Sequence, residues 1–347
     1  MKTCFMKKII LLSCGLLLMT ASCSKKLNMT EAYMPEERTL NVMKITDENS
    51  KTVGINIGGL KVGKPALSSM GVNKSSKIQW DPYRRLAVSP DGAELAYLTY
   101  EGKNIDDNTI FNIMIRNSSK GAPTQRTFRN IRSLSWGNDG RLYSSDFSDG
   151  KYFQLVSVDS HVGNLVRQLT SNNNDHDPIL SNDGRMLFFE RLDKSGPSIW
   201  SYDLKTSALT VCAAGFNPCP VGDGHDMFVC VRNNTAGYSE LWLINYTLGQ
   251  ETLILSDKEH SFTNPDVSPD GEWIVCQGNT TSSIKKRKNL DIFAVRIDGS
   301  GLIQLTHHPA HDCCPVFSKD GNYVYFISTR TNKDDLWNIW RMNFTTF

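Results

Sequence analysis

Short hydrophobic runs separated by turn residues recur along this chain at a nearly constant interval. The tetrad Ser-Pro-Asp-Gly stands at 89–92 and 268–271, and degraded copies stand at 137–140, 181–184, 221–224 and 318–321. Each Asp-Gly pair predicts a hairpin turn, because glycine accepts a positive φ and aspartate bonds its own backbone. The terminal glycines are 48, 44, 40, 47 and 50 residues apart, an interval typical of propeller blades.

Three strand-like runs follow the turn in most repeats, and one precedes it. The first runs are 95–100, 185–190, 227–231, 273–276 and 323–327. The second runs are 111–116, 153–158, 199–203, 241–246, 291–297 and 336–343. The third runs include 165–170, 209–213, 251–256 and 302–306. The pattern predicts an all-β fold, a six-bladed β-propeller of four-stranded antiparallel blades whose closed ring protects its strand edges.

The sixth repeat stops after its third strand and lacks a fourth. Two strand-like runs near the start of the body, 41–45 and 51–57, are candidates for the missing strand. We therefore predict that an amino-terminal strand completes blade six and closes the ring. Whether 41–45 is a fifth strand of blade six or the remnant of a seventh blade stays open, and we assign six blades.

The amino terminus has the pattern of an export signal. Lys7 and Lys8 precede an apolar run, 9–19, that is too short to span a bilayer as a helix but suits a signal peptide. The small residues before Cys23 resemble the lipobox of bacterial lipoproteins, whose cysteine is acylated. We predict a lipoprotein signal peptide at 1–22, a flexible tether at 23–38 and the propeller at 39–347. The alternative is an ordinary signal peptide cut near Ala21.

An acylated Cys23, carrying palmitate or similar chains, would hold the protein on a membrane durably. The residue after it is Ser24, whereas an aspartate there resembles an inner-membrane retention signal. We expect a protein anchored in the outer membrane at its periplasmic face, with exposure at the cell surface left open. Export also permits disulfides, but we expect six body cysteines to be mostly buried small hydrophobes: Cys212, Cys219, Cys230, Cys276, Cys313 and Cys314.

Charge limits the partners further. The chain has 38 Lys and Arg against 36 Asp and Glu, a formal charge of +2, which does not favour a nucleic-acid partner. The strongest basic run, 285–288, indicates a solvated loop or a contact with an anionic surface.

Two phrases of the sequence resemble the β-propeller repeat of TolB. They are Asn264-Pro265-Asp266-Val267-Ser268-Pro269-Asp270-Gly271 and the stretch from Leu305 to Gly321, which contains Leu-Thr-His-His-Pro-Ala-His-Asp and then Pro-Val-Phe-Ser-Lys-Asp-Gly. The resemblance covers roughly 78–347 and implies the propeller fold. It also implies protein partners such as peptidoglycan-associated or secretion components. The amino-terminal α/β domain of TolB has no counterpart in 24–77. Similar repeats form the propeller of prolyl-oligopeptidase-like peptidases, but we expect no such activity, because their hydrolase domain has no counterpart in this sequence.

Polar residues precede the proline that starts several inner strands, where the chain should face the central channel. We predict that they form a binding site at one mouth of the channel, by the rule that loops on a rigid scaffold carry function. The alternative is that they only cap and hydrate the channel. The residues are His176, Asp177, Asn217, Asn264, His311, Asp312 and Cys314.

No residue pattern predicts catalysis with comparable strength. A Gly-x-Ser-x-Gly elbow is missing from the sequence. His307, His308 and His311 suggest a metal site when taken alone, but the paired Cys-x-x-Cys spacing of structural zinc is missing, so we expect no metal and no cofactor. We expect a monomeric, non-catalytic platform for an envelope protein or a small ligand or glycan. The alternative is a polysaccharide lyase or glycosidase, metal-dependent or not, using Asp175, Asp177 and Asp312, the acids that the repeat alignment places at the channel mouth.

Overall fold

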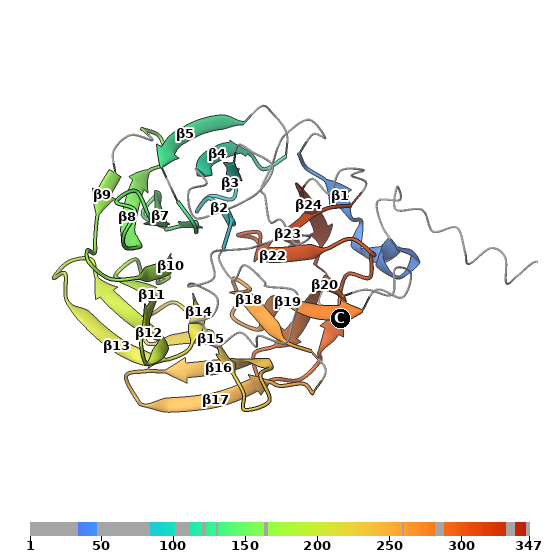
Figure 1. Ribbon diagram of the computed structural model, residues 1–347. Coiled ribbons are helices and arrows are strands. Elements are labelled where there is room, and N and C mark those ends of the chain that lie inside the picture. The colour runs from blue at the N-terminus through green and yellow to red at the C-terminus, as the bar shows by residue number, and fades with distance from the viewer. Residues whose placement is uncertain are drawn as a thin grey trace, which may run out of the picture.

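The computed structural model confirms the predicted six-bladed β-propeller (Figure 1). It describes residues 34–46, 84–100, 111–119, 123–129, 131–162, 166–258, 260–281, 288–330 and 337–344. The predicted signal peptide with Cys23, the run 51–57 and residues 285–287 lie outside these ranges. In the described residues, no helix is long and apolar enough to cross a membrane.

Each blade is one four-stranded antiparallel sheet. Blade one consists of β2 (Leu86–Val88), β3 (Glu94–Tyr100), β4 (Phe111–Asn117) and β5 (Thr124–Arg129). Blade two consists of β6 (Ser135–Trp136), β7 (Arg141–Asp146), β8 (Gln154–Asp159) and β9 (Val166–Gln168). Blade three consists of β10 (Asp175–Leu180), β11 (Met186–Asp193), β12 (Gly196–Asp203) and β13 (Leu209–Ala214). Blade four consists of β14 (Phe216–Pro220), β15 (Met227–Asn233), β16 (Ser239–Asn245) and β17 (Gln250–Leu255). Blade five consists of β18 (Phe262–Val267), β19 (Trp273–Thr281), β20 (Lys288–Arg296) and β21 (Ile303–Gln304). Blade six consists of β22 (Asp312–Phe317), β23 (Tyr323–Ser328), β24 (Asn338–Asn343) and β1 (Met43–Lys44).

The repeated Asp-Gly turns all lie at one end of the ring, which we call the turn face. In the turn of blade five, Ser268 Oγ accepts a hydrogen bond from the Trp273 amide at 2.9 Å, and Gly271 has a φ of 75° that favours glycine. At the opposite end, which we call the loop face, inner strands begin where their partners finish, as the pairing of Asp312 with Ser328 shows. The predicted mouth residues therefore belong to the loop face.

Both ends of the chain meet in blade six, as predicted. β1 pairs antiparallel with β24 and takes the fourth place in that sheet, so the blue and red ends of the chain lie side by side in Figure 1. Residue Thr46 repeats the geometry of Thr170 in blade two, because the Oγ1 of each accepts a backbone N–H of the third strand at 3.0 Å. The run 41–45 thus supplies the fourth strand, not a fifth strand and not part of a seventh blade.

A short 3-10 helix, η1 (Pro35–Leu40), precedes β1 and is docked against the ring. Glu37, near its centre, is fully buried. The described part of the chain thus begins with a docked segment, which includes residues 34–38 of the predicted tether.

Hydrophobic side chains fill the spaces between neighbouring blades. Trp273 and Val275 of blade five pack with Val324, Phe326 and Trp340 of blade six. Burying side chains of this size stabilises the fold by about 1.5–3 kcal/mol each. Five of the six body cysteines are also buried, Cys212 is half-buried, and all six are unbridged, which agrees with their predicted role as small hydrophobes.

Candidate functional site

Four of the predicted mouth residues occupy one position in four successive blades. Asp177, Asn217, Asn264 and Cys314 each lie at the bulge near the start of an inner strand. Their φ angles are 47°, 49°, 51° and 51°, a left-handed conformation that Asp and Asn tolerate better than other non-glycine residues. The bulge interrupts the strand alternation there and lets consecutive blades bring these side chains together.

The four side chains are linked to one another from blade to blade. Asn217 Nδ2 donates to Asp177 Oδ2 at 3.2 Å, and the backbone N–H of Asn264 donates to Asn217 Oδ1 at 3.2 Å. Asn264 Nδ2 donates to Cys314 Sγ at 3.4 Å. All four residues are at most 3% exposed, so they line the centre of the ring from within and do not face open solvent.

Arg84, just before blade one, completes this chain of contacts. Its guanidinium forms a buried ion pair with Asp177 and donates to the Pro218 carbonyl at 2.5 Å, and its amide donates to Asp177 Oδ1 at 3.1 Å. Burial opposes the charge on Arg84, but Asp177 and the other acidic groups around it together outweigh burial and raise the pKa of Arg84 above its ordinary value. We call Arg84, Asp177, Asn217, Asn264 and Cys314 the axial ring.

A second acid beside the axial ring was not found from the sequence. Glu190 on β11 accepts the Asn217 amide at 3.2 Å through Oε2, whereas its buried Oε1 has no hydrogen-bond partner among the described residues. Burial and the adjacent Asp177 carboxylate raise the pKa of Glu190 to about 8. Its side chain is therefore predominantly protonated at neutral pH. A signal was present, because Gln277 stands at the same distance after its turn glycine and accepts the Cys314 backbone N–H at 3.0 Å, as Glu190 accepts that of Asn217.

His176 lies beside the axial ring and is also buried. Its imidazole packs on the Phe153 ring, with the centroids 4.3 Å apart, and burial lowers its pKa to about 3. The ring is therefore neutral in the folded protein. The preceding Asp175 is held by Arg191, whose Nε lies 2.6 Å from Asp175 Oδ1.

The remaining predicted residues, His311 and Asp312, lie at the start of blade six, and Asp312 belongs to a separate cluster there. Arg330 Nη2 contacts Asp312 Oδ2 at 2.5 Å, and Arg330 Nη1 contacts Glu37 Oε2 at 2.5 Å. All three side chains of this triad are fully buried. We call Glu37, Asp312 and Arg330 the clasp, because they join η1 to the beginning of β22. The His311 ring stacks on Trp337 with the centroids 6.4 Å apart.

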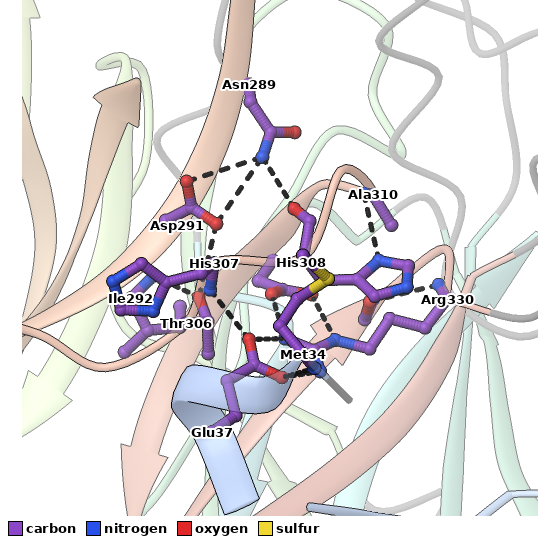
Figure 2. Close-up of polar contacts among 12 residues, drawn as sticks. Met34, Glu37, Asn289, Asp291, Ile292, Thr306, His307, His308, Ala310 and Arg330 are labelled. Atoms are coloured by element: carbon purple, nitrogen blue, oxygen red, sulfur yellow. Dashed lines mark hydrogen bonds and ion pairs between the residues drawn. The ribbon is translucent and has the colours of Figure 1, made fainter. Parts of the chain in front are cut away.

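Backbone and side-chain donors surround the clasp. Glu37 also accepts the His307 amide at 2.6 Å and the Met34 amide at 3.0 Å (Figure 2). Burial acts to raise the pKa of Glu37, but the Arg330 charge and these donors together lower it below its ordinary value. Nearby, burial and the Asp312 charge raise the pKa of Asp291 well above its ordinary value. Asp291 accepts hydrogen bonds from neutral donors such as Asn289 Nδ2, at 3.3 Å.

The three acids that the sequence placed at the channel mouth for possible catalysis are engaged by arginines. Asp177 pairs with Arg84, Asp175 pairs with Arg191 and Asp312 pairs with Arg330. In the described ranges, no three His, Cys, Asp or Glu side chains are grouped to hold a metal ion. The histidines at 307, 308 and 311 diverge: His308 Nδ1 accepts the Ala310 amide at 3.0 Å, while His311 stacks on Trp337.

An open hollow of about 380 Å³ lies at the loop face of blade two. Its walls combine acidic and amide groups with two valines, and a volume of this size lies in the range of small-molecule sites. The lining residues are Asp146, Ser148, Asp149, Gln154, Val156, Val166 and Gln168. The repeat pattern did not indicate this hollow, since its residues lie outside the aligned slot.

Comparison with known proteins bears on the fold. No family model matches the chain. An uncharacterized protein of Agrobacterium fabrum is 26% identical over 230 residues, which are 63% of this chain and 72% of that protein. Among solved structures, TolB from Acinetobacter baumannii aligns with a TM-score of 0.55 at 15% identity, over 76% of this chain and 63% of its own. This chain thus spans less than two thirds of the length of that TolB.

Two further structures extend the comparison. A protein assigned as TolB from Agrobacterium tumefaciens aligns with a TM-score of 0.56 at 14% identity, over 76% of this chain and 90% of its own. Oligogalacturonate lyase from Vibrio parahaemolyticus aligns with a TM-score of 0.51 at 12% identity, over 88% of this chain and 97% of its own. Likenesses at such identities establish architecture, not activity. The chain is a TolB-like six-bladed β-propeller.

Proposed function

We propose that this protein is a cell-envelope lipoprotein whose propeller is a non-catalytic binding platform. Acylated Cys23 anchors it to the outer membrane at the periplasmic face, and the loop face binds an envelope protein or a small ligand or glycan. The amino-terminal export pattern supports the anchor, and η1 and β1 tie the segment that follows it to the ring.

One observation carries the choice of platform over enzyme. Asp175, Asp177 and Asp312 are the acids that the sequence places for catalysis, and each is buried and ion-paired with an arginine. A carboxylate that is buried against an arginine is shielded from substrate, whereas a general acid or nucleophile must contact the substrate. These groups hold inner strands in register and thereby position the loops.

Metabolic labelling with palmitate tests the anchor. We expect the wild-type protein to incorporate the label and to sediment with membranes, and Cys23→Ser to lose both properties. Ser24→Ala is the matched change directly beside the anchor, and it should keep the label and the membrane fraction. Unchanged labelling of Cys23→Ser would contradict the lipid anchor.

Site-specific photo-crosslinking in the cells that make the protein tests the platform. A photoreactive residue at exposed Asp149 or Lys194 probes the loop face, and the same residue at exposed Asp270 or Asp320 probes the turn face. We expect an adduct of one discrete mass from the loop face alone. Adducts confined to the turn face, or none from either face, would overturn the proposal.

The lyase from Vibrio parahaemolyticus makes an enzymatic alternative worth measuring, because it aligns over nearly its whole length. The purified protein is incubated with polygalacturonate, and unsaturated products are followed by ultraviolet absorbance. We expect no turnover. Turnover that is abolished in Asp177→Asn would replace the platform with a lyase whose site includes the axial ring.

A further inference from the structure

The outer strand of blade three differs from the outer strands of the other five blades. β13 has the sequence Leu-Thr-Val-Cys-Ala-Ala, six residues without a charge or a proline. Among the others, β1 and β21 are two residues long, while β5, β9 and β17 each contain arginine or glutamate. Natural sheets usually protect their edges by short strands or charged residues. β13 uses neither device, and the bulge at Cys212 does not set it apart, because β5 and β17 contain the same bulge.

The edge of β13 is also accessible. In the described part of the chain, β12 is its only strand neighbour, so its other side presents unpaired backbone groups. Leu209 is 42% exposed and Val211 is 58% exposed, and residues two apart share one face of a strand. The half-buried Trp200 lies opposite Val211 on β12. An apolar row therefore runs beside an open strand edge.

Charged groups of the next blade are already engaged at one end of β13. Arg232 Nε donates to the Ala214 carbonyl at 2.9 Å, and Arg232 Nη1 contacts Glu251 Oε2 at 2.7 Å. This contact caps the end of the strand. The accessible part is the stretch that begins at Leu209, and no charged residue belongs to it.

We propose that β13 pairs with β13 of a second copy of this chain, antiparallel and about a two-fold axis. A two-fold contact sets a surface against itself, so each side chain near the axis meets its own kind. Like charges that lie opposite each other destabilise a strand pair. Among the described outer strands longer than two residues, β13 is the one without a charged residue. The pair joins two blades into one continuous sheet and covers Leu209 and Val211. It replaces the monomer expected from the sequence.

Sedimentation velocity of the full chain in nonionic detergent tests this pairing over a dilution series. We expect a dimer that dissociates on dilution, and a monomer at every concentration for Val211→Lys and Leu209→Lys. Each lysine would place two like charges across the new strand pair. Leu302→Lys is the matched control, because Leu302 is also 42% exposed but lies in blade five, and it should remain dimeric.

Each other outcome overturns the proposal. A wild-type protein that is monomeric at its highest soluble concentration forms no such pair. A dimer that survives both β13 substitutions uses another surface. Loss of the dimer in Leu302→Lys as well would show a general effect of added charge. Unchanged circular dichroism of each variant establishes that the fold is intact.

Discussion

The axial ring and the clasp are two buried polar clusters with different origins. The axial ring is built largely from one repeat position in successive blades, and neutral amides carry most of its links. The clasp joins a repeat position, Asp312, to Glu37 from outside the repeat, and one arginine, Arg330, forms an ion pair with both carboxylates. The difference indicates a division of tasks. The four repeat positions of the axial ring align blades three to six, which are covalently consecutive, while the clasp joins η1 to blade six, which are far apart in the sequence.

The largest effect should come from removing the cation of the clasp. Arg330→Met leaves Glu37 and Asp312 buried without a counter-charge, and breaking such a pair costs about 3–5 kcal/mol. We expect that loss in the free energy of unfolding measured with urea. Arg185→Met is the control, because its side chain is 58% exposed in its pair with Asp203 and should cost at most about 1 kcal/mol.

A milder change keeps this test informative if Arg330→Met does not fold. Glu37→Gln retains most of the shape of the side chain but removes one charge of the triad. It should lower the urea midpoint less than Arg330→Met and more than Arg185→Met. Equal midpoints for all three variants would mean that the clasp does not hold the closed ring.

Glu190, the acid beside the axial ring, should make the free energy of unfolding depend on pH. The pKa of Glu190 is about 8 in the fold, above its ordinary value of 4.5, so folding favours the protonated acid. Its contribution to stability is complete below pH 4.5 and is lost as the pH rises through 8. Glu190→Gln removes this loss and should stabilise the protein by about 3 kcal/mol at pH 7.

Unfolding free energies of wild type and Glu190→Gln, compared at about pH 5 and about pH 8, check this prediction. The gap between the two proteins should widen with pH. Glu251→Gln is the control, because its pKa shift has the opposite sign. Hydrogen bonds from Arg232 lower the pKa of that half-exposed acid, whereas the pKa of Glu190 is raised. A gap that does not vary with pH would show that Glu190 is charged throughout.

These two clusters also separate what the sequence could predict from what it could not. Repetition exposed Asp177, Asn217, Asn264 and Cys314, because four blades place a residue at one bulge, and it also determined the number of blades. It did not show that the four side chains would be buried against each other. Their burial depends on how far each side chain extends toward its neighbours, which the spacing of residues along the chain does not show.

Residues that occur only once were missed, because no repetition along the chain marks them. Arg84, Glu37 and Arg330 do not recur in type from blade to blade, and their roles come from contacts between residues as far apart as 293 positions. One signal was nevertheless present for the closure. Ile45-Thr46 matches Leu169-Thr170 and Leu305-Thr306, and the threonine of each pair caps a third strand.

A smaller pH effect of opposite sign should come from His176. Burial lowers its pKa to about 3 from 6.5, so its contribution to stability is complete above pH 6.5 and is lost as the pH falls through 3. At pH 5 the loss is about 2 kcal/mol. His176→Phe keeps an aromatic ring against Phe153 and should remove this acid sensitivity in urea titrations at about pH 7 and about pH 5. The same change at exposed His161 should leave the acid sensitivity in place, and an unchanged slope in His176→Phe would contradict the neutral, buried assignment.

The smallest expected effect gives the most direct comparison of the closing strand with an ordinary fourth strand. Thr46 Oγ1 accepts the Ile339 amide at 3.0 Å, and Thr170 Oγ1 accepts the Leu155 amide at 3.0 Å. Replacing either threonine by valine keeps the shape and leaves a buried donor without its acceptor, at a cost of about 1 kcal/mol. Thr46→Val also removes the hydrogen bond that Thr46 Oγ1 donates to Asn338 Oδ1 at 2.8 Å, so its loss of unfolding free energy should be at least as large as that of Thr170→Val if β1 is held as firmly as a strand within the chain. A loss for Thr170→Val alone would mean that the amino-terminal strand leaves blade six in solution, and then the clasp, not the strand, would close the ring.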